Sequence, residues 1–164
     1  MRVVGIDPGT RKTGWGVVDK KGTRLIAVAS GTIQVNAKKP LAHRLHAIQV
    51  GISQVIEEYS PDVMALEDMF FAKFPNAAIK LGHARGVAMV AGAAAGLEVH
   101  EYPPALVKRT VAGKGNATKS QVARLVGAIL GLRELPGEDA TDALAVAVTH
   151  LQTLRSLPPV VRRR

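Results

Sequence analysis

Val3-Val4-Gly5-Ile6-Asp7-Pro8-Gly9 opens this 164-residue chain and indicates its architecture. The apolar run predicts a short buried strand, and the acid with Pro-Gly predicts the turn that ends it. Residues 13–19 predict a second strand and residues 24–35 a third, joined by a hairpin turn at Lys20-Lys21-Gly22. Gly31 lies inside the third strand and predicts that this strand is bulged. The chain therefore begins as a β-meander.

Helical and extended segments alternate after the meander. An apolar stripe at helical spacing predicts a helix over residues 40–59; it consists of Leu41, Leu45, Ile48, Ile52 and Val55. The later segments predict strands at 63–66 and 97–102 and helices at 76–95, 104–111, 118–130 and 139–154. This order predicts an α/β fold, a five-stranded mixed sheet with helices on both faces. We expect one domain over residues 1–155 and a basic, flexible tail over 156–164.

The charge balance narrows the class of protein. The chain has 22 Lys and Arg against 13 Asp and Glu, a formal net charge of +9, which attracts polyanions. Nucleic acid is favoured over a merely solubilising charge, because lysines cluster near glycines in loops. The absence of cysteine excludes disulfides, thiolate zinc sites and cysteine nucleophiles.

No segment predicts export or membrane insertion. The apolar start breaks at an acid, so it is no secretory signal. The apolar run at 87–97 is about half the length of a membrane span, so it predicts a buried helix. We expect a cytoplasmic protein without membrane attachment.

Four carboxylates stand where strands end or a helix begins: Asp7, Glu67, Asp139 and Asp142. If the first and fourth strands are parallel neighbours, Asp7 and Glu67 meet at one edge of the sheet. The other two are three residues apart, so they project from one face of the last helix. Each acid alone has an ordinary alternative, such as a turn or a helix N-terminus. Together they predict a site for Mg²⁺ or Mn²⁺, with two ions suited to phosphodiester cleavage.

Aromatic and basic residues near these acids predict DNA contacts. Phe70, Phe71 and Lys73 fall in the loop after Glu67, where an aromatic ring can stack on an unpaired base. Filling the core is the alternative for each phenylalanine. Phe70→Ala should lower DNA cleavage without affecting metal binding, and unchanged cleavage would reject the stacking role.

Three lysines surround the glycines of the 113–116 loop: Lys108, Lys114 and Lys119. Glycine lets the backbone approach phosphate, and lysine supplies charge without reading bases. A solvated basic face is the alternative. Lys119 is also expected to offset charge that develops at the scissile phosphate.

Five ordered blocks carry a family resemblance. They are Gly5 to Thr10 with Thr13-Gly14-Trp15-Gly16, Ala65-Leu66-Glu67 through Phe70-Phe71-Ala72-Lys73, Lys80 to Ala88, Val107 to Val111 with Lys119 to Val122, and Asp139 to Ala145. In this order they resemble the RuvC family of bacterial Holliday junction resolvases, over residues 3 to about 151. The resemblance implies an RNase H-like fold and a homodimeric, metal-dependent endonuclease. Such enzymes cut four-way DNA junctions by paired, symmetric nicks after RuvA and RuvB have migrated the junction.

The same resemblance assigns roles to residues. It implies that Asp7, Glu67, Asp139 and Asp142 are the catalytic, metal-binding acids. Phe70 would stack on a base near the crossover, and Lys108 and Lys119 would lie near DNA and the active site. We also expect DNA contacts from Lys80 and Arg85 of the central block.

Other functions stay open on the sequence alone. An ATPase or sugar kinase of the actin-like fold also begins with a strand and an acid-Gly-Thr turn, but this chain is short for two such lobes. A non-catalytic junction-binding protein would have little use for bare acids, which repel phosphates. RNase H-like resolvases without the Lys108–Lys119 basic segment are a closer alternative. Gly82-x-x-x-Gly86 and Gly92-x-x-x-Gly96 predict close contact with another helix, in the same subunit or in a partner.

Overall fold

The computed structural model describes residues 1–68 and 75–154. Its strands are β1 (Arg2–Asp7), β2 (Lys12–Lys21), β3 (Arg24–Gln34), β4 (Val63–Glu67) and β5 (Glu98–Tyr102). Its helices are α1 (Leu41–Tyr59), α2 (Pro75–Ala94), α3 (Pro104–Ala112), α4 (Lys119–Leu130) and α5 (Glu138–Thr153). The predicted order of elements is confirmed. The predicted tail at 156–164 lies outside the described residues.

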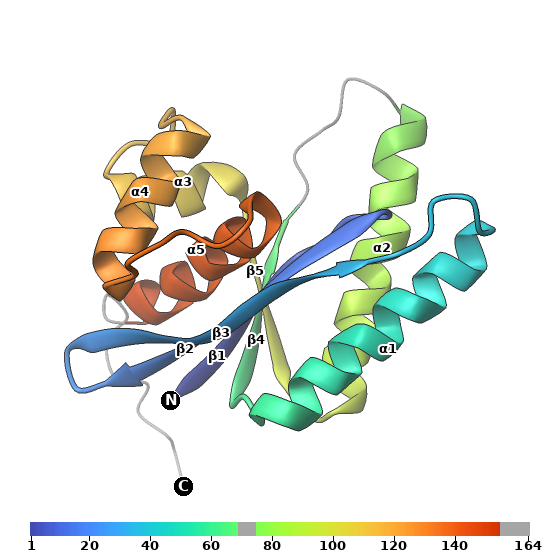
Figure 1. Ribbon diagram of the computed structural model, residues 1–164, viewed down its shortest axis with the longest axis horizontal. Helices are drawn as coiled ribbons and strands as arrows, with labels where there is room; N and C mark the ends of the chain where they lie inside the picture. Colours follow the sequence, from blue (N-terminus) through green and yellow to red (C-terminus); the bar gives the residue numbers. More distant parts are fainter. Residues whose placement is uncertain (69–74, 155–164) are drawn as a thin grey trace, which may run out of the picture.

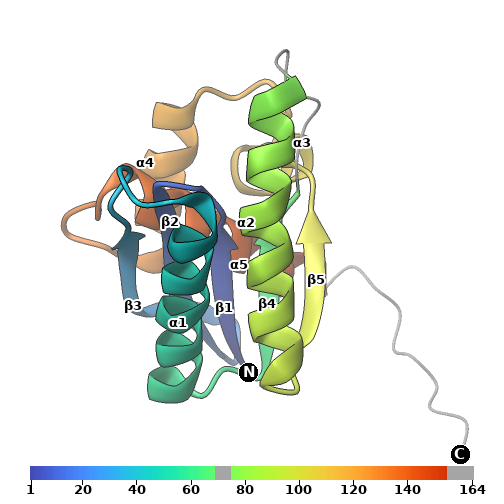
Figure 2. The same ribbon diagram turned by 90° about the vertical axis from the view of Figure 1, so that its right-hand side faces the viewer.

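The five strands form one mixed sheet in the order β3-β2-β1-β4-β5. β2 runs antiparallel to β1 and β3, whereas β1, β4 and β5 are parallel. Helices α1 and α2 cover one face of the sheet and α3, α4 and α5 cover the other (Figure 1). Figure 2 shows α1 and α2 side by side across their face. This is the predicted α/β architecture, with helices on both faces.

The apolar start of the chain explains why β1 lies inside the sheet. Val3 belongs to the core on the α3–α5 face, whereas Val4 and Ile6 belong to the core on the α1–α2 face. Successive side chains of a strand point to opposite faces, so a strand covered on both faces must be apolar throughout. The central position of β1 puts its last residue, Asp7, at the middle of one sheet edge.

Glycines allow α5 to lie directly on β1 and β2. A Cβ added at Gly5 would overlap the carbonyl oxygen of Ala143 and lie 2.8 Å from the nitrogen of Ala147. A Cβ added at Gly14 would overlap the carbonyl oxygen of Asp139. Only residues without a side chain permit such close approach of two backbones. These contacts fix the start of α5 beside the sheet edge that carries Asp7.

The predicted bulge in the third strand is present, but it does not lie at Gly31. Gly31 pairs regularly with Trp15, and the register shifts instead between Val17 and Val18, where Val28 of β3 is the extra residue. A Cβ at Gly31 would lie 2.8 Å from the Trp15 ring. The glycine therefore makes room for an indole and does not bend the strand.

The expectation of a wholly buried helix at 87–97 is wrong. Val90 is 60% exposed, as is Ile79, which lies about three turns earlier on α2. Gly92 faces Met64 and Val99 of the sheet, whereas a Cβ at Gly96, beyond the end of α2, would meet nothing within 4 Å. The Gly92-x-x-x-Gly96 pattern therefore does not mark close contact with another helix. Within residues 1–68 and 75–154, no helix has the length and hydrophobicity to cross a membrane.

Candidate active site

Parallel pairing brings the first two predicted acids together. β1 pairs with β4 so that Ile6 lies opposite Leu66, and each strand continues one residue further, to Asp7 and Glu67. Both acids line one pocket of about 270 Å³ at this edge of the sheet. The prediction that they meet at the carboxyl ends of parallel strands is confirmed.

Burial makes these two carboxylates difficult to ionise together. It raises the pKa of Asp7 to about 8, with further contributions from the charge of Glu67 and from their shared hydrogen bond. The pKa of Glu67 is also raised, chiefly by burial. Two acids in contact in a poorly solvated place share a proton near neutral pH. A bound cation would displace that proton.

The last helix adds a third acid. Asp142 lines the same pocket, and its side chain is 24% exposed. Asp139, one turn earlier, does not line the pocket, although its backbone lies against Gly14. The structure therefore brings together three of the four predicted acids around one pocket.

Lys119 faces these acids from the start of α4. Thr118 caps that helix, accepting from the backbone of Gln121, whose side chain accepts in return from the Thr118 backbone. The cap places the Lys119 Nζ 3.1 Å from Asp142 Oδ2 and 2.9 Å from Glu138 Oε1. The hydrogen bond to Glu138 is the largest cause of a raised pKa for this ammonium. Lys119 therefore stays charged beside the pocket.

The other predicted DNA contacts are distributed more widely. Lys108 lines the pocket, whereas Lys80 on α2 and Lys114 after α3 are exposed and do not line it. Arg85 forms ion pairs with Asp68 and Glu101. The predictions for Phe70, Phe71 and Lys73 lie outside the described residues.

Sequence reasoning missed Glu138 and the apolar walls of the pocket. Glu138 holds Lys119, and Pro104, Val107, Val122 and Ala145 close the space around the acids. The position of Glu138 in the first turn of a helix offered a weak signal, because acids there stabilise the helix dipole. The sequence contains no sign that the apolar residues line a pocket, since they come from three separate helices that meet only in the folded protein.

The donor chemistry of the pocket fits a hard cation. Its candidate ligands are carboxylate oxygens, without sulfur or paired imidazoles, which suits Mg²⁺ or Mn²⁺. Asp7 and Glu67 share a proton because burial disfavours two negative charges side by side, and a bound metal ion would neutralise both carboxylates. Among the residues that the structure describes, however, no three His, Asp or Glu side chains converge closely enough to hold an ion as they stand. Asp142 instead faces the ammonium of Lys119.

The raised pKa of Asp7 predicts a pH dependence of stability. Between about pH 4 and pH 8 the folded protein binds this proton more tightly than the unfolded chain, so stability falls as pH rises through that window. In EDTA, Asp7→Asn should reduce this dependence to the part that comes from the raised pKa of Glu67, and should stabilise the protein at pH 8 by at least about 1 kcal/mol. Urea unfolding of both proteins at pH 5 and pH 8 measures the difference. An equal pH response in the two would contradict the assignment.

Comparisons with known proteins agree with this geometry. The family model described as crossover junction endodeoxyribonuclease RuvC matches residues 3–150. The protein of that name from Geobacter sulfurreducens is 52% identical over 150 residues, covering 92% of each chain. The structure of Thermus thermophilus RuvC in complex with Holliday junction substrate superimposes with a TM-score of 0.90 at 37% identity, covering 95% of this chain and 96% of the other.

A more distant match supports the fold alone. The yeast mitochondrial Holliday junction resolvase superimposes with a TM-score of 0.67 at 11% identity, over 92% of this chain and 78% of the other. Together with the family match over nearly all the described residues, the comparisons confirm the RNase H-like fold. This chain belongs to the RuvC family of crossover junction endodeoxyribonucleases.

Proposed function

We propose that this protein is a nuclease that resolves four-way (Holliday) DNA junctions by paired, symmetric, metal-dependent nicks. The observation that carries the proposal is the pocket shared by Asp7, Glu67 and Asp142, with two lysines beside it, in a chain of net charge +9. Membership of the RuvC family indicates the substrate, because the structure of the related Thermus thermophilus RuvC is a complex with a Holliday junction substrate.

Each group in the pocket has a chemical task in this proposal. Asp7, Glu67 and Asp142 would hold Mg²⁺ or Mn²⁺, two ions in each site, with Asp139 as the fourth acid. The ions would supply the acidity that activates water and stabilises the leaving oxygen. Lys108 and Lys119 would attract the scissile phosphate and offset its charge.

The remaining basic and aromatic predictions extend the DNA surface. We propose that the exposed Lys80 and Lys114 contact phosphates away from the cut. The stacking role of Phe70, with Phe71 as the alternative, and the phosphate contact of Lys73 stay predictions from the sequence.

Incubation with labelled DNA tests the activity directly. A mobile four-way junction and a linear duplex of the same sequence are mixed with the protein, with and without Mn²⁺. We expect paired nicks in the junction only, and only with the metal. Equal cutting of the duplex would contradict junction selectivity. Metal-dependent ATP hydrolysis without DNA would favour the actin-like alternative, and binding without nicks would favour a non-catalytic junction protein.

Lys119→Ala should lower the cleavage rate by about 10²-fold, the usual effect of losing one charged stabiliser of a transition state. The reason is its position, 3.1 Å from Asp142 and beside the pocket of acids. Single-turnover cleavage at moderate salt measures the change. Lys21→Ala is the control, since it removes an exposed lysine from the opposite end of the sheet. Normal cutting by Lys119→Ala would remove Lys119 from the site.

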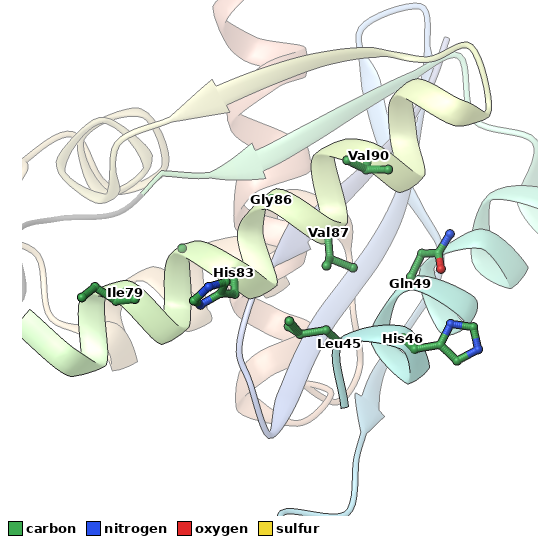
Figure 3. Close-up of a pocket in the computed structure, with 9 residues that line it drawn as sticks. Leu45, His46, Gln49, Ile79, His83, Gly86, Val87 and Val90 are labelled. Carbon is green, nitrogen blue, oxygen red and sulfur yellow. The ribbon is translucent and has the colours of Figure 1, made fainter. Parts of the chain in front are cut away.

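An exposed apolar groove supports the proposal of a homodimer. It lies between α1 and α2, has a volume of about 660 Å³, and includes Ile79, Val87 and Val90 of α2. Figure 3 shows Leu45 of α1 and Val87 of α2, two of the residues that line it. Exposed apolar surface of this kind is typical of protein interfaces. A symmetric dimer would present two equivalent sites to a junction that is nearly two-fold symmetric.

Val90→Glu should dissociate that dimer, because it buries an unpaired charge in the interface. The expected cost is about 3 kcal/mol or more, which weakens association at least about 10²-fold. Sedimentation measures the mass, and a junction assay in supercoiled DNA measures the pairing of nicks. Val28→Glu on β3 is a matched control, since that valine is also exposed. An unchanged dimer would move the interface elsewhere.

We further propose one nuclease domain over residues 1–155 with a basic tail at 156–164, acting in the cytoplasm. Cooperation with RuvA and RuvB, which would deliver migrated junctions, belongs to the same proposal. These proposals extend the family resemblance. The single domain is also supported by residues 1–68 and 75–154, whose helices cover both faces of one sheet.

A further inference from the structure

We propose that Arg85 is a positioning residue of the active site and not a DNA contact. It would hold the end of β4, and through it Glu67, from the face of the sheet opposite the pocket. This inference rests on the proposed nuclease function, in which Glu67 is a metal-binding acid.

The contacts of Arg85 join three elements. From α2, its Nη2 lies 3.0 Å from Asp68 Oδ1, directly after β4, and the same nitrogen pairs with Glu101 Oε1 of β5. The backbone N–H of Asp68 also donates to the carbonyl of Tyr102, at 2.9 Å. The residue that follows Glu67 is therefore held by both its side chain and its backbone.

These contacts lie on the opposite face from the pocket. Leu66 belongs to the α1–α2 core together with Ala84, the neighbour of Arg85 in sequence. Glu101 pairs with Leu66 across the parallel strands. Because side chains alternate along a strand, Glu67 points to the other face, where it lines the pocket. Arg85 thus holds Asp68, the residue after Glu67, and Glu101, the β5 residue that pairs with Leu66, and it leaves Glu67 itself free to face the pocket.

Charge and burial argue against contact with phosphate. The Arg85 side chain is only 19% exposed, and it stands between two carboxylates. One guanidinium with two carboxylates has a net charge of −1, which repels a phosphate. A planar guanidinium suits this task, because the N–H bonds of Nη2 point in fixed directions toward the two acids.

Junction binding without metal distinguishes the two roles. A residue that neutralises one phosphate contributes about one unit to the slope of log K against log salt. For Arg85→Ala in EDTA we expect a slope and an affinity equal to those of the wild type. A slope lower by about one, with weaker binding, would overturn the proposal.

Cleavage supplies the second measurement. With Mn²⁺ and saturating junction, Arg85→Ala should cut about 10–100-fold more slowly, with little change in KM, because a displaced catalytic group lowers the rate without affecting binding. Arg85→Lys should recover part of the rate. Arg2→Ala is the matched control: it removes an ion pair with Asp19 at the other end of the sheet, so comparable loss of rate there would mean that general destabilisation is the cause.

Glu101→Gln changes a different measurement for each of the two roles. If Arg85 contacts DNA, removing a neighbouring acid should tighten binding and leave cutting intact. If Arg85 positions β4, cutting should fall while binding stays the same. The wild-type protein separates the two proposals: its failure to cut would reject the nuclease function, whereas the binding slopes would still decide whether Arg85 contacts DNA.

Discussion

Asp7→Asn should abolish nearly all junction cleavage, by about 10³-fold, while junction binding is retained. Asp7 lies in the middle of the sheet edge, in contact with Glu67 and on the same pocket as Asp142. Asparagine has nearly the same shape but carries no negative charge, so it is a weaker ligand for a divalent cation. Metal ions supply several kcal/mol of transition-state stabilisation, and each 1.36 kcal/mol is a factor of ten in rate.

The measurement is single-turnover cleavage of a labelled four-way junction in Mn²⁺, together with binding in EDTA. Asp62→Asn is the matched control. That acid is 62% exposed and accepts from the backbone of Arg2 at the other end of the sheet, 2.6 Å away. We expect it to cut normally. Cleavage by Asp7→Asn within tenfold of the wild type would remove Asp7 from the catalytic centre.

Gly5→Ala should destabilise the fold by about 3 kcal/mol or more. The added methyl group would overlap the Ala143 carbonyl oxygen and crowd the Ala147 nitrogen and side chain. These are backbone atoms in the middle of α5, so no side-chain rotation relieves the overlap. Overpacking of a core typically costs about 1–3 kcal/mol, and more when backbone must move.

Urea unfolding in EDTA measures this loss. Gly137→Ala is the control, because a Cβ there meets nothing within 4 Å and the residue has an ordinary φ of −55°. Its effect should stay within about 1 kcal/mol. A stability of Gly5→Ala equal to that of the control would mean that α5 can move away from the sheet at little cost.

The position of Asp7 and Glu67 was predictable because it depends on local features. An apolar run that ends in an acid gives a strand end, and parallel pairing of two such strands places the acids side by side. The cap at Thr118, and therefore the start of α4 at Lys119, was equally visible in the sequence.

The difference between Asp139 and Asp142 was not predictable. Spacing shows that two residues share a helix face, but not how the helix is rotated against the sheet. That rotation is set by contacts of α5 with Gly5 and Gly14, more than 100 residues away in the chain. The role of Gly31 was not predictable for the same reason. It makes room for the ring of Trp15 on the neighbouring strand, a contact that depends on how the strands pair.

The pairing of Arg85 also depends on distant residues. A basic side chain near a nuclease site suggests DNA contact when only its type is known. One of its acids, Asp68, directly follows β4 and the other, Glu101, lies in β5, so the three residues meet only through the tertiary structure. The same holds for Val90, whose exposure follows from which side of α2 rests on the sheet.

The delivery of Asp142 by the final helix has a consequence for protein synthesis. A chain emerging from the ribosome carries Asp7 and Glu67 long before residue 142 exists, and α5 must then dock on β1 and β2. An unfinished polypeptide therefore holds only part of the acid set that cutting requires. We expect no junction cleavage from a chain in which α5 has not yet been made and docked on β1 and β2.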